Sequence, residues 1–187
     1  MKWFTVGGAL AWVLLSVVNV RAENNPATRL SLKDLGGIAI HVEPIGAKAQ
    51  KDGLSLRAIR GAVESRLRKA EIAVLTHEQQ QKLPRRPRLV VRLDTSQLST
   101  GEYLYSIHTE VTQWVASLAD PEVTVAQAIP VPATTWSAAG VFGITPPGEL
   151  SRDAHHAVDK MVGEFIDAYY KANPSQTAFR LRRIGKL

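Results

Sequence analysis

Residues 38–75 decide the fold, and they read IAIHVEPIGAKAQKDGLSLRAIRGAVESRLRKAEIAVL. Apolar side chains alternate over residues 38–43, which predicts a strand, and residues 47–53 then predict a loop. Over residues 56–70 the apolar positions recur at spacings of three and four, as expected of an amphipathic helix. Residues 72–75 predict a second, short strand. Because a strand–helix–strand unit is almost always a right-handed crossover, we expect these two strands to be parallel.

Further strands are predicted after a polar loop that ends in prolines. Residues 88–94 and the longer stretch 103–115 alternate apolar and polar side chains, which indicates two strands joined by a short turn. Residues 123–129 resume the alternation. Pro130 and Pro132 follow, and a proline cannot donate to a strand ladder. We therefore expect an edge strand or a broken strand at this point.

The last predicted element is a long helix near the C-terminus. Gly140 and Gly143 predict bends before it, and Pro146 and Pro147 predict its first turn, with Thr145 as its N-cap. The apolar stripe of this helix comprises Leu150, Ala154, Ala157, Val158, Met161, Phe165 and Ala168. The stripe predicts that one face of the helix packs on the sheet.

These elements predict an α+β fold with the order β-α-β-β-β-β-α. Both helices should pack on one face of a mixed, mostly antiparallel sheet, giving a two-layer domain. We place this single domain at residues 38–173, where Asn173-Pro174 ends the helix. Residues 23–37 are expected to be an extended lead-in, and residues 174–187 a basic, disordered tail.

The N-terminus carries the features of an export signal. Residues 1–22 combine an early lysine, an uncharged apolar run and Val20-Arg21-Ala22 at the expected cleavage site. We expect cleavage between Ala22 and Glu23 and a periplasmic or extracellular mature protein. The alternative is that the apolar run is retained as a membrane anchor. The chain has no cysteine, so neither disulfides nor a lipid attached to an N-terminal cysteine contribute.

The positive charge is concentrated outside the predicted domain. The chain has 23 Lys and Arg residues against 17 Asp and Glu residues. Two of the basic residues lie in the signal segment, and four lie in the tail: Arg180, Arg182, Arg183 and Lys186. The remaining part is formally neutral, which argues against nucleic-acid binding. The tail is predicted to be a solvated terminus. The alternatives are that its basic residues contact an anionic lipid or polymer surface, and that its apolar residues form a final strand.

The sequence contains no recognisable catalytic or metal-binding pattern. There is no G-x-S-x-G motif, no P-loop and no G-x-G-x-x-G. His155 and His156 are adjacent in the predicted helix, so they point about 100° apart and cannot share a ligand. We therefore predict no catalytic residues, no metal and no cofactor. A hydrolase with a triad assembled from distant residues remains the minor alternative.

Five apolar or aromatic residues form a candidate ligand site. A curved sheet closed by the C-terminal helix can hold an apolar pocket, and its lining would be Tyr105, Val111, Trp136, Phe142 and Phe165. This arrangement would suit a carrier of a small apolar ligand or lipid. The alternative is that these residues are ordinary core and sheet packing.

The order of elements from Gly37 to Gln97 resembles the N-terminal α/β domain of the translocation protein TolB. The resemblance rests on the strand 38–43, the phrase AVESRLRKA at 62–70, and the strands 71–76 and 88–94. The chain is also similar to uncharacterised exported bacterial proteins whose long helix ends in Asn-Pro. An exported, neutral, two-layer domain without a catalytic pattern predicts a non-catalytic envelope module that binds a protein or an envelope polymer. The resemblance brings no catalytic residues, and this chain has no propeller domain after the module.

Overall fold

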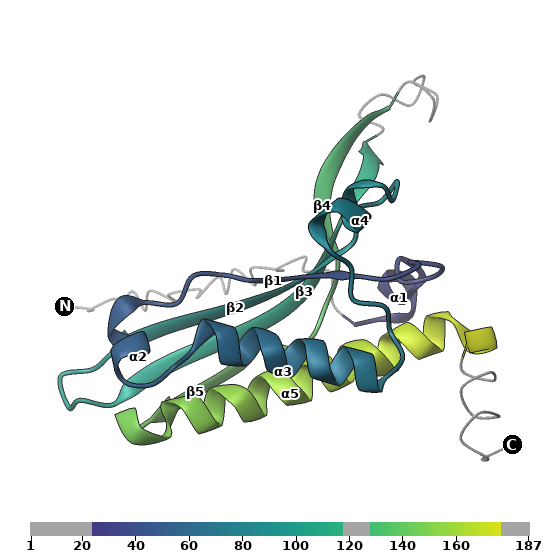
Figure 1. Cartoon of the computed structure of the whole chain (residues 1–187). Coiled ribbons are helices and arrows are strands. Elements are labelled where there is room, and N and C mark those ends of the chain that lie inside the picture. The colour runs from purple at the N-terminus through teal and green to yellow at the C-terminus, as the bar shows by residue number, and fades with distance from the viewer. Residues whose placement is uncertain (1–23, 118–127, 177–187) are drawn as a thin grey trace, which may run out of the picture.

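The computed structural model describes residues 24–117 and 128–176 of the chain, which form a sheet with two long helices against it (Figure 1). The elements in chain order are α1 (Pro26–Leu30), β1 (Ala39–Val42), α2 (Ala47–Lys51), α3 (Leu56–Lys69), α4 (His77–Gln81), β2 (Arg88–Gln97), β3 (Tyr103–Ser117), β4 (Ile129–Ser137), β5 (Val141–Thr145) and α5 (Pro147–Ala172). The predicted signal peptide and the four basic tail residues lie outside the described residues.

The sheet is mixed, and β3 is its longest strand. β1 pairs with β2 in parallel, and β2 pairs with β3 in antiparallel. The first half of β3 pairs with β5 and its second half pairs with β4, both in antiparallel. The helices α3 and α5 pack on each other and lie on the same face of the sheet (Figure 1). The predicted α+β class and its two layers are thus confirmed.

The core lies between the sheet and the two long helices. Leu89 and Val91 of β2, which alternate on one face, are both 0% exposed, as is Leu67 of α3. Every residue of the predicted apolar stripe of α5 is buried. α3 begins where Ser55 accepts a hydrogen bond from the backbone N–H of Ala58, at 3.3 Å. The periodicity therefore predicted both long helices and the faces that they bury.

The predicted extended lead-in over residues 23–37 is wrong for the residues that the structure describes. Asn25 caps the helix α1 by accepting from the backbone N–H of Thr28 at 3.0 Å, and Pro26 occupies the first helical position. Leu32 and Leu35 then enter the hydrophobic core. The core therefore begins before the predicted boundary at residue 38, because these two leucines supply apolar area that the sheet buries.

The second predicted strand, over residues 72–75, is reduced to one parallel bridge between Ile38 and Val74. The parallel direction was predicted correctly, but the strand that pairs along β1 is β2. The chain leaves the sheet because Thr76 caps the short helix α4, accepting from the backbone N–H of Gln79 at 3.3 Å. The segments expected to be loops thus contain the one-turn helices α2 and α4.

The C-terminal half differs from the prediction in three places. β4 runs through Pro130 and Pro132 instead of ending there, and it is an edge strand as expected. Most of the predicted strand over residues 123–129 lies outside the described residues. β5 occupies the segment where Gly143 predicted a bend. The N-cap of α5 is Pro146 and not Thr145, whose side chain bonds elsewhere.

Within residues 24–117 and 128–176, no helix combines the length and the apolar character that crossing a bilayer requires.

Candidate functional site at the β5 edge

The five residues predicted to line a ligand pocket do not form one site. Val111, Trp136 and Phe165 are each 0% exposed and belong to the packed core. The rings of Trp136 and Phe165 meet edge to face, with centroids 5.6 Å apart. Tyr105 is half-buried against the same core, whereas Phe142 is 69% exposed. Three of the five therefore pack together as core, and Phe142 lies on the opposite face of the sheet.

The exposed Phe142 belongs to an apolar patch on the face of the sheet opposite α3 and α5. Leu104, Phe142 and Ile144 are 45%, 69% and 60% exposed, and we call these three residues the open-face patch. Leu104 and Ile144 are direct partners in the β3–β5 pairing. The ring of His108 meets that of Phe142 edge to face, with centroids 5.6 Å apart. Contiguous exposed apolar side chains of this kind are typical of interaction surfaces.

The hydrogen bonds of β3 show which backbone groups of β5 face outward. In an antiparallel strand, alternate residues direct both N–H and C=O to the same side. The N–H of Trp114 donates to the carbonyl of Arg85 at 2.8 Å, on the β2 side. The carbonyl of Thr109 accepts from Ala138 at 2.9 Å, on the other side. Because β2 and β3 pair without a register shift, odd-numbered residues of β3 face β5 throughout.

The two exposed residues of β5 also carry its outward-facing backbone. The odd residues Tyr103 and Tyr105 of β3 are opposite Thr145 and Gly143. The backbone of these β5 residues is therefore bonded to β3, while that of Phe142 and Ile144 faces away from it. No strand of residues 24–117 and 128–176 pairs with this outer side of β5. The same two residues thus offer free main-chain groups and apolar side chains.

The neighbouring edge, along β4, is blocked by its prolines. Pro132 is opposite Trp114, whose N–H faces β2, so the nitrogen of Pro132 faces the outer edge. Pro130 has the same orientation two residues earlier, so two successive outward donors are missing. Apolar side chains are also exposed here, and Arg86 covers the ring of Trp114 at 4.7 Å. Prolines on an edge strand prevent another strand from pairing there, which leaves β5 as the open part of this edge.

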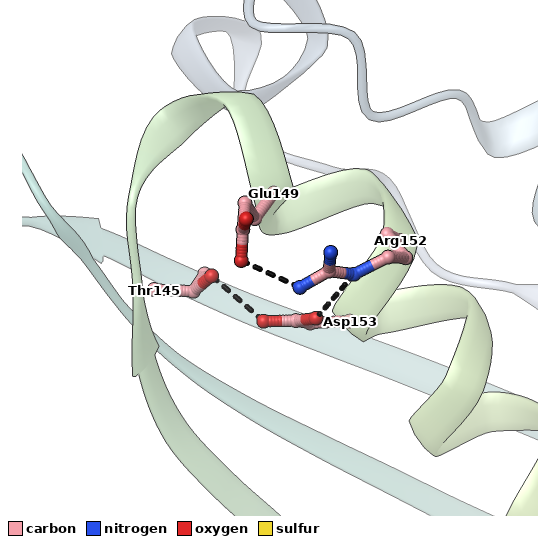
Figure 2. Close-up of polar contacts among 4 residues, drawn as sticks. All are labelled: Thr145, Glu149, Arg152 and Asp153. Carbon is pink, nitrogen blue, oxygen red and sulfur yellow. Dashed lines mark hydrogen bonds and ion pairs between the residues drawn. The ribbon is translucent and has the colours of Figure 1, made fainter.

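A polar cluster ties the end of β5 to the first turns of α5 (Figure 2). The hydroxyl of Thr145 donates to one oxygen of Asp153 at 2.7 Å. The other oxygen accepts from Nε of Arg152 at 3.3 Å, and Nη2 of Arg152 donates to Glu149 at 2.5 Å. Two carboxylates and one guanidinium give the cluster a formal charge of −1. Thr145 is buried, so this hydrogen bond fixes where β5 ends relative to the helix.

The Asp153 carboxylate predicts a pH dependence of stability. The hydrogen bond from Thr145 holds the pKa of Asp153 below its ordinary value, and Arg152 adds to this effect. A lowered folded-state pKa stabilises the fold above the unfolded pKa of about 3.9 and loses that stabilisation as the pH falls through the folded-state value. We expect the melting temperature of Asp153→Asn to lie below that of the native chain at pH 7. The gap should close below about pH 4, and a gap that stays constant down to pH 2 would refute this cause.

Gly143 is required by the side chain that lies over it. A Cβ at this position would stand 2.5 Å from the Tyr105 hydroxyl oxygen and 2.6 Å from the adjoining ring carbon. Tyr105 is the direct cross-strand partner of Gly143, so it covers the backbone that a side chain would otherwise cover. The glycine is therefore a packing position in β5 and not the bend that was predicted.

This packing gives a double-mutant test. Gly143→Ala should lower the free energy of unfolding by about 1–3 kcal/mol, because the Tyr105 ring must move. The same change in a Tyr105→Ala background should cost less, since the obstructing ring is gone. Urea denaturation of the four proteins of the cycle measures this coupling. Equal costs in both backgrounds would mean that the ring adjusts freely.

Elsewhere on the described surface, polar side chains form ion pairs. Arg92 binds both carboxylate oxygens of Glu43, at 2.8 and 2.9 Å, across β1 and β2. Within the described ranges no three metal-ligating side chains come together. A groove of about 370 Å³ lies between α3 and α5, lined by Arg66, Lys69, Ala70, Gly163, Ile166 and Asp167. The β5 edge differs from these sites because it has both exposed apolar side chains and outward-facing backbone groups.

Comparison with known proteins gives little further information. No protein-family model matches the chain, and neither does any curated protein. The resemblance to the TolB domain thus gains no support from the family models. A solved structure, a minor lipoprotein from Acinetobacter baumannii, aligns with 12% sequence identity and a TM-score of 0.29, covering 73% of this chain and 94% of that one. At that identity and TM-score, the likeness carries no argument about how this chain works.

Proposed function

We propose that this chain is a non-catalytic module of the cell envelope that binds a protein partner at the outer edge of β5. One observation carries the proposal: Phe142 and Ile144 present exposed apolar side chains and outward-facing backbone groups on the same unpaired edge. Strand addition uses both features, since main-chain hydrogen bonds supply affinity and alternate side chains supply specificity. In this proposal residues 1–22 act as the export signal that the sequence predicts, and the mature chain begins at Glu23 in the periplasm or outside the cell.

The structure favours this function over the carrier of a small apolar ligand. Three of the residues that would line a pocket between the sheet and α5, namely Val111, Trp136 and Phe165, are fully buried in the core instead. Phe142 and Ile144, which are 69% and 60% exposed, lie instead on the open face of the sheet. An extended protein segment can cover such a face while pairing with the strand beside it.

A photo-reactive amino acid at position 142 tests the proposal in the native envelope. We expect irradiation to give a discrete adduct with an identified protein, because the side chain of Phe142 lies beside the proposed segment. The same reagent at Arg57, an exposed position of α3 on the other side of the molecule, is the control and should give no such adduct. Failure at position 142, or the same adduct at both positions, would contradict the proposal. Mass spectrometry of the purified protein also tests the mature N-terminus.

A further inference from the structure

We infer that the outer edge of β5 takes the C-terminal segment of a second copy of this chain as an added strand. The inference rests on the proposed function, which makes β5 the interaction edge, and it names the occupant of that edge. Residues 177–187 read TAFRLRRIGKL, so Phe179 and Leu181 alternate with Arg180 and Arg182. As a strand, residues 179–182 of this segment have one apolar face and one basic face.

Both faces of the segment have a counterpart at β5. In neighbouring strands, side chains on the same face lie side by side. Phe179 and Leu181 would therefore lie beside Phe142 and Ile144 on the open face. Arg180 and Arg182 would then point to the helix side, where the cluster of Glu149, Arg152 and Asp153 carries a formal charge of −1 (Figure 2). Apolar side chains meet apolar ones, and positive charges meet a negative cluster.

The segment cannot reach this edge on its own copy of the chain. The described chain ends at Gln176, beyond the C-terminal end of α5, whereas β5 lies at the opposite end of that helix (Figure 1). α5 spans 26 residues, which is about 39 Å at roughly 1.5 Å per residue. Phe179 and Leu181 extend at most about 10–18 Å beyond Gln176 at roughly 3.3–3.6 Å per residue. The donor is therefore a second copy.

The other edges of the sheet are less suitable for the same segment. Along β4, Pro130 and Pro132 remove two outward-facing donors. Along β1, the strand has four residues, and Ile38 just before it is already bridged to Val74. Its exposed side chain is His41, which gives the apolar residues of the segment nothing to pack on. If two copies exchange their segments reciprocally, the assembly closes as a two-fold dimer.

Light scattering of the full mature chain, residues 23–187, tests the inference. We expect a concentration-dependent dimer that dissociates when the synthetic peptide 177–187 is added in excess. Raising the salt concentration should weaken the dimer, since part of the attraction is between exposed charges. Leu181→Asp should weaken it as well, because it places a charge against the apolar patch.

Proline substitutions separate strand addition from side-chain contact. Ile144→Ala removes most of the side chain but keeps the outward N–H, whereas Ile144→Pro also removes that donor. The proline variant should dimerise about fivefold more weakly than the alanine variant, as expected for one lost main-chain hydrogen bond. Thr134→Pro is the matched control on the proline-blocked β4 edge and should change nothing. Dimers that persist unchanged in Ile144→Pro would overturn the inference.

N-methylated peptides test the same point without altering the fold. In an added strand only alternate N–H groups face the neighbour. Two peptides, one N-methylated at Arg180 and the other at Leu181, should therefore differ: one should lose its ability to dissociate the dimer, and the other should keep it. Equal effects at the two positions would overturn strand addition.

A chain that stays monomeric while the peptide binds vesicles containing anionic lipid would show that the tail contacts membranes, and this also overturns the inference. In that case an adduct at position 142 with another protein leaves the proposed function intact. A chain that is monomeric and gives no adduct at position 142 would contradict both the inference and the proposed function.

Discussion

Leu67→Ala is expected to lower the free energy of unfolding by about 2–5 kcal/mol. Leu67 is 0% exposed and lies centrally on the buried face of α3, within the core shared with the sheet and α5. Truncation removes apolar contacts on all sides, and the two long helices restrict how far the cavity can close. At about 2–4 °C per kcal/mol for a chain of this size, the melting temperature should fall by roughly 5–20 °C.

The neighbouring Arg68 is the matched control for this prediction. Its side chain is exposed on the opposite face of α3, so Arg68→Ala should change the free energy of unfolding by less than about 0.5 kcal/mol. Urea denaturation of the two variants gives both values under the same conditions. Similar midpoints would mean that the buried face of α3 has been wrongly assigned.

Asn173→Ala should have the second-largest effect, lowering the free energy of unfolding by about 2–4 kcal/mol. Asn173 is 3% exposed at the end of α5. Its side-chain amide donates to the carbonyls of Leu32 and Tyr169 at 3.0 and 2.8 Å, and its carbonyl accepts from the backbone N–H of Asp34 at 2.9 Å. Alanine would leave these buried groups without their partner, and burying an unpaired polar group is costly.

The segment that loses protection from hydrogen exchange distinguishes this linking role of Asn173 from a general destabilisation of α5. Asn173 joins the helix end to the segment that follows α1, so hydrogen exchange in Asn173→Ala should accelerate first around residues 32–35. Lys171→Ala, at an exposed position two residues earlier, should leave both exchange and stability close to those of the native chain. Unchanged exchange around residues 32–35 in Asn173→Ala would show that the N-terminal segment is held by other contacts.

The role of Asn173 also shows how far a local pattern can be interpreted. Asn173-Pro174 is a helix stop signal, and α5 ends there as predicted. The same signal says nothing about the buried hydrogen bonds to Leu32 and Asp34, which lie some 140 residues away in the sequence. The sequence does not show whether an Asn at a helix end is a solvent-exposed cap or a buried link to another segment. Its partners here are backbone groups, which every residue carries, so they leave no pattern in the sequence.

One residue of the candidate site at the β5 edge was predicted as a site residue, but for a different kind of site. Phe142 was predicted to line an apolar pocket, and it is a member of the open-face patch. Ile144 was missed because Gly143 was taken as a bend, although alternation of apolar and small residues over 141–145 is compatible with a strand. The contact of Tyr105 with Gly143 explains the glycine, and only the pairing of β3 with β5 brings those two residues together.

The sequence by itself determined the α+β class, the faces of the long helices α3 and α5, and the alternating faces of β2 and β3. It did so because helical and extended backbones impose periods of 3.6 and 2 on the side chains that must be buried. Only the tertiary structure decided that β1 pairs with β2, that β5 continues the edge begun by β4, and that the backbone of Phe142 and Ile144 faces outward. The physical reason is that periodicity fixes which face a side chain occupies, whereas the direction of each backbone hydrogen bond depends on which distant strand lies alongside.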